Sequence, residues 1–250
     1  MNVIWAITKR EIHSFFKTPI GWLCILGFSI INGVIFSWVV AAYSDPAAVR
    51  SGHVADINQQ ILPDYFGTLS VILLLLSPVI SMRSFAEDRK QQSFTLLLSS
   101  PISSFSIVMG KFLGLAIFSL FLIATTLPCS ILLVRYGEPN IAILAANYLA
   151  NFLMLVSCCS LGMTISACTK NQLIAGTISF ISILLLWFCS GIAPLLSNSF
   201  SDILSYISLL DHIGSMSKGL VQVKDIVYFL GFIVFFIFAC TQRVERYRWQ

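Results

Sequence analysis

Long apolar runs dominate this chain of 250 residues, and they limit the folds that it can adopt. Several runs reach about 20 residues, the length that a helix needs to cross the apolar core of a bilayer. Backbone polar groups inside a bilayer must be hydrogen-bonded within the protein, so we expect these runs to be helices. Only 10% of the residues are charged, whereas a soluble domain carries about 25%. The sequence therefore predicts an all-α integral membrane protein.

Six of the runs are apolar enough to be transmembrane helices. The second and the sixth are short, and we expect neighbouring residues to extend them. We also expect residues 1–250 to form a single transmembrane domain. The predicted spans are residues 20–42, 66–81, 108–134, 141–167, 173–193 and 226–240.

The lysines and arginines between the spans predict the orientation, because cytoplasmic connections carry an excess of them. With the N-terminus in the cytoplasm, only Arg50, Arg135, Lys218 and Lys224 of the 15 basic residues lie outside. The opposite orientation would invert this imbalance. We therefore expect both termini to be cytoplasmic.

Residues 1–18 have the pattern of an amphipathic helix. Trp5, Phe15 and Phe16 lie on an apolar face, and basic side chains share the adjoining face. Helices of this kind tend to lie in the plane of the lipid headgroups. We therefore expect an interfacial helix whose three aromatic side chains anchor it in the membrane. The alternative is an ordinary charged segment that leads into the first span.

Residues 83–98 are predicted to form a short cytoplasmic helix between the second and third spans. Arg83 and Glu87 are four residues apart, a spacing at which opposite charges stabilise a helix. The helix should end before Pro101, because a residue that precedes proline disfavours the helical region. A charged helix with an apolar end at 96–98 could dock on a partner protein. A solvated hairpin between two spans is the alternative.

Residues 194–225 would lie on the outer side, yet apolar residues recur there at helical spacing. The segment is too apolar for a solvated loop and too interrupted for a full span. A re-entrant or surface-lying helix fits this pattern best.

The sequence lacks the motifs of an enzyme. It has no P-loop, because Gly110 and Lys111 are followed by Phe112 and no glycine stands five residues before Gly110. The three histidines are far apart, and none of the seven cysteines has metal-ligand spacing. Basic residues are spread beside the spans, which argues against a nucleic-acid partner. We predict no catalytic residue, no metal site and no cofactor bound by this chain. Gly110 and Gly114 have the spacing that lets two helices approach closely, which is a weak signal on its own.

Three blocks of sequence carry a family resemblance. The first is R-E-I-H-S-F-F-K-T-P-I-G-W at residues 10–22. The second begins S-P-V-I-S-M-R-S-F-A-E-D at residue 77, continues through L-L-L-S-S-P-I-S and ends at G-K-F, residues 110–112. The third begins D-H-I-G-S-M-S-K-G at residue 211 and continues to Y-F-L at 228–230. Together they resemble the permease subunits of ABC-2-type ABC transporters, most closely the gliding-motility-like branch. The chain departs from that pattern at Q-S-F-T, residues 92–95, where the family usually has G-T-x-E.

The resemblance implies an interfacial N-terminal helix, six spans, a cytoplasmic coupling helix and re-entrant helices between spans five and six. It implies that the coupling helix docks on a separate ABC ATPase subunit, which would bind ATP and Mg. It also implies a second permease chain, identical or related, in the plasma (inner) membrane of a bacterium, with export as the usual direction.

Within this family setting, Arg83, Glu87, Asp88 and Arg89 are the predicted contacts to the ATPase. Glu87 could instead brace its own helix. The alternative function is a membrane platform that anchors an ATPase and transports nothing.

Overall fold

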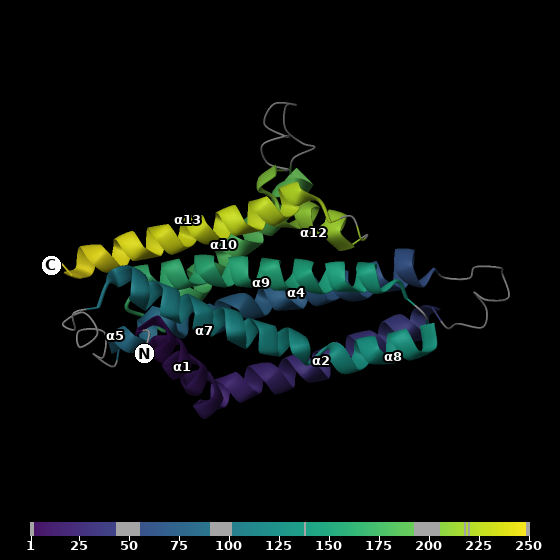
Figure 1. Cartoon of the computed structure of the whole chain (residues 1–250), viewed down its shortest axis with the longest axis horizontal. Coiled ribbons are helices and arrows are strands. Elements are labelled where there is room, and N and C mark those ends of the chain that lie inside the picture. The colour runs from purple at the N-terminus through teal and green to yellow at the C-terminus, as the bar shows by residue number, and fades with distance from the viewer. Residues whose placement is uncertain are drawn as a thin grey trace.

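The computed structural model describes residues 3–43, 56–90, 102–137, 139–192, 206–217, 219 and 221–248. Every regular element in these ranges is a helix, and the long helices form one elongated bundle (Figure 1). Six helical stretches are long and apolar enough to cross a membrane, and each coincides with a predicted span. The second and sixth are longer than the apolar runs alone, as expected. The stretches are Pro19–Tyr43, Ile57–Arg89, Ser104–Gly137, Ile141–Cys168, Gln172–Cys189 and Val223–Tyr247.

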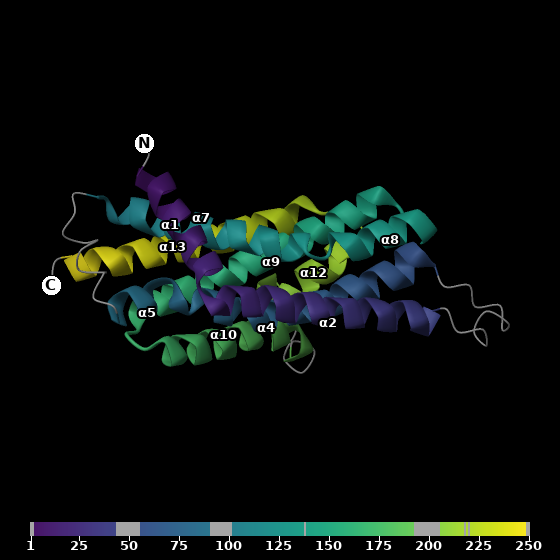
Figure 2. The same cartoon turned by 90° about the horizontal axis from the view of Figure 1, so that it is seen from below.

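Both chain ends lie at the same end of the bundle, close to the short helix α5 (Figures 1 and 2). The elements in chain order are α1 (Val3–Lys17), α2 (Pro19–Tyr43), the π-helix η1 (Ile57–Ile61), α4 (Leu62–Ser81), α5 (Arg83–Lys90), α7 (Ser104–Ala124), α8 (Leu127–Gly137), α9 (Ile141–Cys168), α10 (Gln172–Ile192), α12 (Leu209–Ser217) and α13 (Val223–Arg248).

Helix α9 is the centre of the bundle. It packs against α4, α7, α10 and α13 along its length, and most of its residues are buried. Ser166, in its last turn, is hydrogen-bonded to α5. Asn147, in its second turn, donates to the backbone oxygen of Ser217 in α12 (3.1 Å). α9 therefore contacts α5 with one end and α12 with the other.

The third predicted span is broken into α7 and α8, a feature that the apolar pattern did not predict. Pro128 has no amide hydrogen, and its ring clashes with the carbonyl group four residues earlier, so a continuous helix is unfavourable there. The hydroxyl groups of Thr125 and Thr126 donate to the backbone oxygens of Leu122 and Ile123, at 2.6 and 2.8 Å. The amides of the same two threonines donate to the same two oxygens, at 3.2 and 3.0 Å, so the chain tightens into a turn between α7 and α8.

Of the segment predicted to be re-entrant or surface-lying, 194–225, the structure describes residues 206–217, 219 and 221–225, and these include α12. It packs against α9, α10 and α4 with Leu209, Ile213 and Met216 buried. The residues that fill its inner face recur three or four apart.

A tight corner joins α1 to α2. The amide of Gly21 donates to the backbone oxygen of Thr18 (3.2 Å), and Trp22 Nε1 donates to the backbone oxygen of Phe16 (2.9 Å). A Cβ atom on Gly21 would lie 2.0 Å from the backbone oxygen of Phe15. Only glycine fits here, which accounts for the P-I-G-W end of the first block.

We expect Gly21→Ala to destabilise the protein by about 2 kcal/mol, because the added methyl group must displace backbone rather than a flexible side chain. The melting temperature in detergent should fall by about 5 °C. Gly27→Ala is the matched control, since a Cβ atom there meets nothing within 4 Å. Equal melting temperatures for the two variants would show that the corner is not under this constraint.

Candidate functional site

The predicted ATPase contacts lie on α5, at the end of the bundle that carries both chain ends (Figure 2). α5 accounts for residues 83–90 of the helix predicted at 83–98, and residues 91–98 lie outside the described part of the chain. Side chains from α1, α7 and α9 surround α5 and fix its position. These contacts define the candidate site.

Arg83 is buried, so only a small part of its side chain is exposed on the surface that the sequence predicted. Its Nε donates to Glu87 Oε2 (2.9 Å), and its Nη1 donates to Thr18 Oγ1 (2.8 Å). The guanidinium also lies 5.4 Å from the centre of the Phe15 ring. We therefore correct the interpretation of Arg83 from a surface contact to an internal brace between α5 and the corner of α1 and α2. Glu87 braces its own helix through Arg83, and 31% of its side chain remains exposed.

Lys111 of α7 is the centre of the site. It is 1% exposed, and its ammonium nitrogen is 2.6 Å from each of three oxygens. These are Oε1 of Glu11 on α1, Oδ2 of Asp88 on α5 and the backbone oxygen of Ser84. An ammonium group has three hydrogens to donate, so all three are used. Arg10 reaches the same two carboxylates from the surface, at 3.1 and 3.4 Å. We call Lys111, Glu11, Asp88 and Arg10 the lysine cluster.

The lysine cluster is charge-balanced, with two cations and two carboxylates. This balance offsets the large cost of burying a lysine, because each charge has an opposite partner and a hydrogen bond. The cluster therefore fastens α1 and α5 to the same point on α7.

Helix α9 holds the other side of α5. Ser166 Oγ accepts hydrogen bonds from the amides of Phe85 and Ala86, at 3.2 and 3.0 Å. It thus satisfies amides in the first turn of α5 that lack a partner within the helix, a contact that contributes about 1 kcal/mol. Arg89 donates to the backbone oxygen of Ala167 (2.5 Å) and lies over the ring of Tyr247 at 4.1 Å. Its positive charge stands at the C-terminal end of α9, where the helix dipole favours a cation.

A polar cavity of about 340 Å³ separates α1 from α5. Charged side chains of both helices line it, namely Arg10, Glu11, Arg83, Glu87 and Asp88. Its walls suit a polar or charged side chain of another protein better than an apolar group.

Two glycines allow α1 to approach α7 at this site. A Cβ atom on Gly110 would lie 2.8 Å from Ile7 Cβ, and one on Gly114 would lie 2.7 Å from Glu11 Cβ. Thr8 Oγ1 also contacts the backbone oxygen of Gly110 (3.1 Å). The spacing of Gly110 and Gly114 therefore allows α1 of the same chain to pack closely against α7.

The three predicted membrane anchors have different surroundings. Trp5 is 55% exposed and free to contact lipid, and Phe16 is half-buried. Phe15 is 5% exposed and stacks on Phe118 of α7 with ring centres 4.5 Å apart. Phe15 is therefore corrected from a lipid anchor to an internal contact. Its place on the apolar face of α1 is as predicted, but α7 covers that part of the face.

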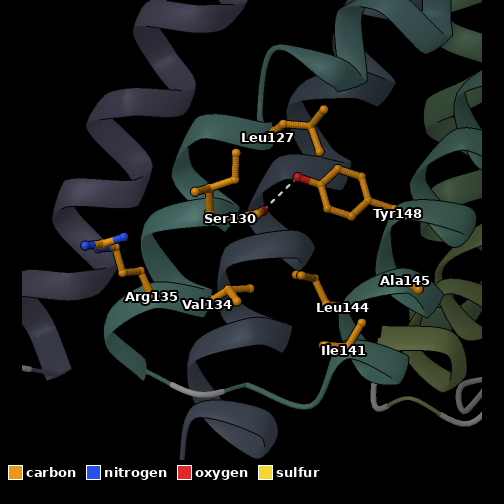
Figure 3. A pocket seen from close by; sticks show the side chains of 9 residues that line it. Leu127, Ser130, Val134, Arg135, Ile141, Leu144, Ala145 and Tyr148 are labelled. Atoms are coloured by element: carbon orange, nitrogen blue, oxygen red, sulfur yellow. Dashed lines mark hydrogen bonds between the residues drawn. The ribbon is translucent and has the colours of Figure 1, made fainter.

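An apolar groove of about 560 Å³ lies between α8 and α9 (Figure 3). α8 lies at the end of the bundle opposite α5 (Figure 2). At its base the Tyr148 hydroxyl contacts Ser130 Oγ (2.7 Å) and Thr126 Oγ1 (2.9 Å). The guanidinium of Arg135 points away from Tyr148 in Figure 3. The groove can hold an apolar group, and its side chains form no acid–base or nucleophile pair.

Sequence reasoning missed Lys111 and Glu11. Both belong to the resemblance blocks, yet neither was predicted to be a site residue. The available signal was that Lys111 stands inside the run 108–134, because a charge within a span is commonly functional. Ser166 gave no signal, since a serine in a span is most often a packing contact.

Within the described ranges, no group of three histidine, cysteine or acidic side chains is placed to hold a metal ion. A comparison with curated proteins found no match to the chain. The sequence model of the ABC-2 type transporter family matches residues 2–221, which is most of the chain. The six apolar helices agree with that match. The chain therefore belongs to the ABC-2 type transporter family, as a transmembrane permease subunit of an ABC transporter.

Proposed function

We propose that this permease couples ATP hydrolysis on a separate ATPase chain to the export of a substrate. The observation that supports the proposal most is the set of contacts that clamps α5 between α1, α7 and α9. When a partner displaces a short charged helix that is held in this way, the displacement is transmitted to the helices that hold it. Because the sequence has no P-loop, ATP and Mg would be bound by the partner.

The contacts of α5 suggest how the displacement would spread. The lysine cluster would carry it to α7 and α1, and Ser166 and Arg89 would carry it to α9. Arg83 would carry it to the corner at the start of α2. A shift of α5 would then move the ends of three spans together. ATP can drive such a shift only if the ATPase contacts α5 differently in its two states.

We further propose that the end of the bundle carrying α5 is cytoplasmic, in the inner membrane of a bacterium. Lys9, Arg10, Lys17 and Lys170 lie at this end and are exposed, in keeping with the excess of positive charge on the cytoplasmic side. The exposed Trp5 would anchor α1 in the headgroup layer. A second permease chain, identical or related, would complete the transport pathway.

Affinity purification from native membranes in mild detergent, followed by mass spectrometry, tests the proposal. We expect a stoichiometric ATPase that carries a P-loop. Glu87→Arg is the best probe of docking, because Glu87 is partly exposed whereas Asp88 is bonded to Lys111. Glu245→Arg makes the same change at an exposed residue of α13 and serves as the control.

The outcomes separate the function from the docking residue. Loss of the ATPase from Glu87→Arg alone, with its melting temperature unchanged, supports both the function and the docking role of Glu87. Retention in both variants moves the docking surface away from Glu87 and leaves the function standing. Absence of any ATPase from the wild-type sample, where a known ABC complex survives, overturns the proposed function. An ATPase that binds with no transport would instead identify a membrane platform.

A further inference from the structure

The apolar groove between α8 and α9 has the features of a binding site for an amphiphile (Figure 3). Both of its walls belong to membrane-spanning stretches, so the groove lies at membrane depth. Its volume of about 560 Å³ falls within the range in which proteins hold small molecules, about 300–1,000 Å³. Leu127, Ile131 and Ile141 at its rim are exposed. A molecule can therefore enter the groove from the bilayer.

The groove exists because α8 packs loosely. The turn at Thr125 and Thr126 separates α8 from α7, which packs against both α1 and α9. Of the 11 residues of α8, only Ser130 and Leu133 are buried. The helix therefore leaves part of α9 uncovered. An apolar space of this kind takes up an apolar group rather than water, because it offers water too few polar partners.

One face of α8 presents an apolar track that ends in a charge. Leu127, Ile131 and Arg135 are four residues apart, so they lie in successive turns on the same face. The track is roughly 12 Å long at 1.5 Å per residue. Leu144 and Tyr148 of α9 line the facing wall. Arg135 stands in the last turn of α8, at the end of the bundle opposite α5 (Figure 2).

The charge of Arg135 has no counterpart in the described part of the chain. Its side chain is exposed, and none of the ion pairs among the described residues includes it. An arginine at the end of a span can lay its stem along apolar surface while its guanidinium reaches the phosphate layer. The guanidinium points away from Tyr148 (Figure 3), and it can form two parallel hydrogen bonds with one phosphate group.

A phospholipid matches the groove better than a helix of a second copy of this chain. Close packing between transmembrane helices relies on small residues, whereas leucine and isoleucine form the rim here. A helix in the groove would also have to cover Arg135 and supply an acidic partner to it. A phospholipid presents an anionic phosphate and an apolar chain in the same order as Arg135 and the track.

We propose that the groove holds one acyl chain of an anionic phospholipid, whose phosphate is bound by Arg135. The chain runs along Ile131 and Leu127 towards Tyr148. The lipid fills the space that α8 leaves open and supports a helix that the rest of the protein covers only in part. Binding of this lipid does not depend on the ATPase, so it can fail without any consequence for the proposed function.

Photo-crosslinking tests the occupant of the groove. The probe is phosphatidylglycerol with a diazirine at the end of one acyl chain, added to the full chain in lipid nanodiscs. We expect crosslinks to peptides that contain residues 127–131 and 144–148. Ala145→Phe should abolish them, because its ring would occupy the groove that Ala145 lines. Ala142→Phe is the matched control, since it adds the same ring at an exposed position of α9 outside the groove.

Competition by unlabelled lipids tests the role of Arg135. Against the wild type, we expect phosphatidylglycerol to compete about tenfold better than phosphatidylcholine with the same chains, the effect of a hydrogen bond between charged groups. Arg135→Gln should lose this preference and keep the crosslinks, because the track is unchanged. Lys224→Gln removes an exposed basic residue of α13 and should retain the preference.

Three results would overturn the proposal. The first is equal crosslinking of a folded Ala145→Phe variant and of Ala142→Phe, because the chain would then lie elsewhere. The second is a wild-type headgroup preference that persists in Arg135→Gln. The third is crosslinking of the groove to a second copy of the chain in place of lipid. If Ala145→Phe melts at a lower temperature than Ala142→Phe, the crosslinked peptides of the wild type and the Arg135→Gln result decide.

Discussion

Lys111→Met should lower the free energy of unfolding by about 3 kcal/mol, because it removes one partner from a buried ionic site. Glu11 and Asp88 would stay close together without the buried ammonium group between them, and the exposed Arg10 would still contact both. The expected fall in melting temperature is about 10 °C in detergent. Because the same lysine fastens α1 and α5 to α7, both helices should also lose protection from amide exchange.

Two further variants distinguish this result from a general effect of losing a lysine. Lys170→Met removes an exposed lysine at the same end of the bundle and should melt like the wild type. Adding Glu11→Gln and Asp88→Asn to Lys111→Met should recover much of the loss, because no charge is then buried without a partner. A Lys111→Met protein as stable as the wild type would show that the lysine cluster does not hold these helices.

Gly110→Leu should release α1 from α7. The new side chain would start 2.8 Å from Ile7 Cβ and 3.0 Å from the backbone oxygen of Ile4, so the two helices must separate. Separation would also break the contact between Thr8 and Gly110 and pull Glu11 away from Lys111. Trypsin should then cleave α1 after Lys9, Arg10 or Lys17 at least about tenfold faster, because cleavage requires local opening of the helix.

A glycine in open surroundings provides the control for this experiment. Gly231 of α13 has nothing within 4 Å of the position where a Cβ atom would stand. Gly231→Leu should therefore leave the cleavage of α1 unchanged. Equal cleavage of Gly110→Leu and wild type would mean that α1 is not docked on α7 through its glycines.

The features that could be predicted from the sequence are those that depend on neighbouring residues alone. A run of apolar residues is a local property, so all six spans were found. The spacing of Arg83 and Glu87 predicted their helix and the ion pair in it. The break between α7 and α8 was not predicted, because the apolar run continues through Pro128.

The features that could not be predicted depend on residues far away in the chain. Phe15 lies on an apolar face, and the pattern cannot tell lipid from another helix as the cover, because both are apolar. The burial of Arg83 depends on Thr18, and the position of the half-buried Asp88 depends on Lys111. No local pattern on α5 records those partners.

The central helix α9 gives the bundle a mechanical property. It runs unbroken for 28 residues, roughly 40 Å at 1.5 Å per residue. The third span, in contrast, is interrupted at Thr125 and Thr126, so α7 can tilt without moving α8. Ser166 ties α9 to α5 at one end, and Asn147 ties it to α12 at the other. By moving as one rigid body, α9 can therefore transmit a displacement of α5 to the far side of the membrane.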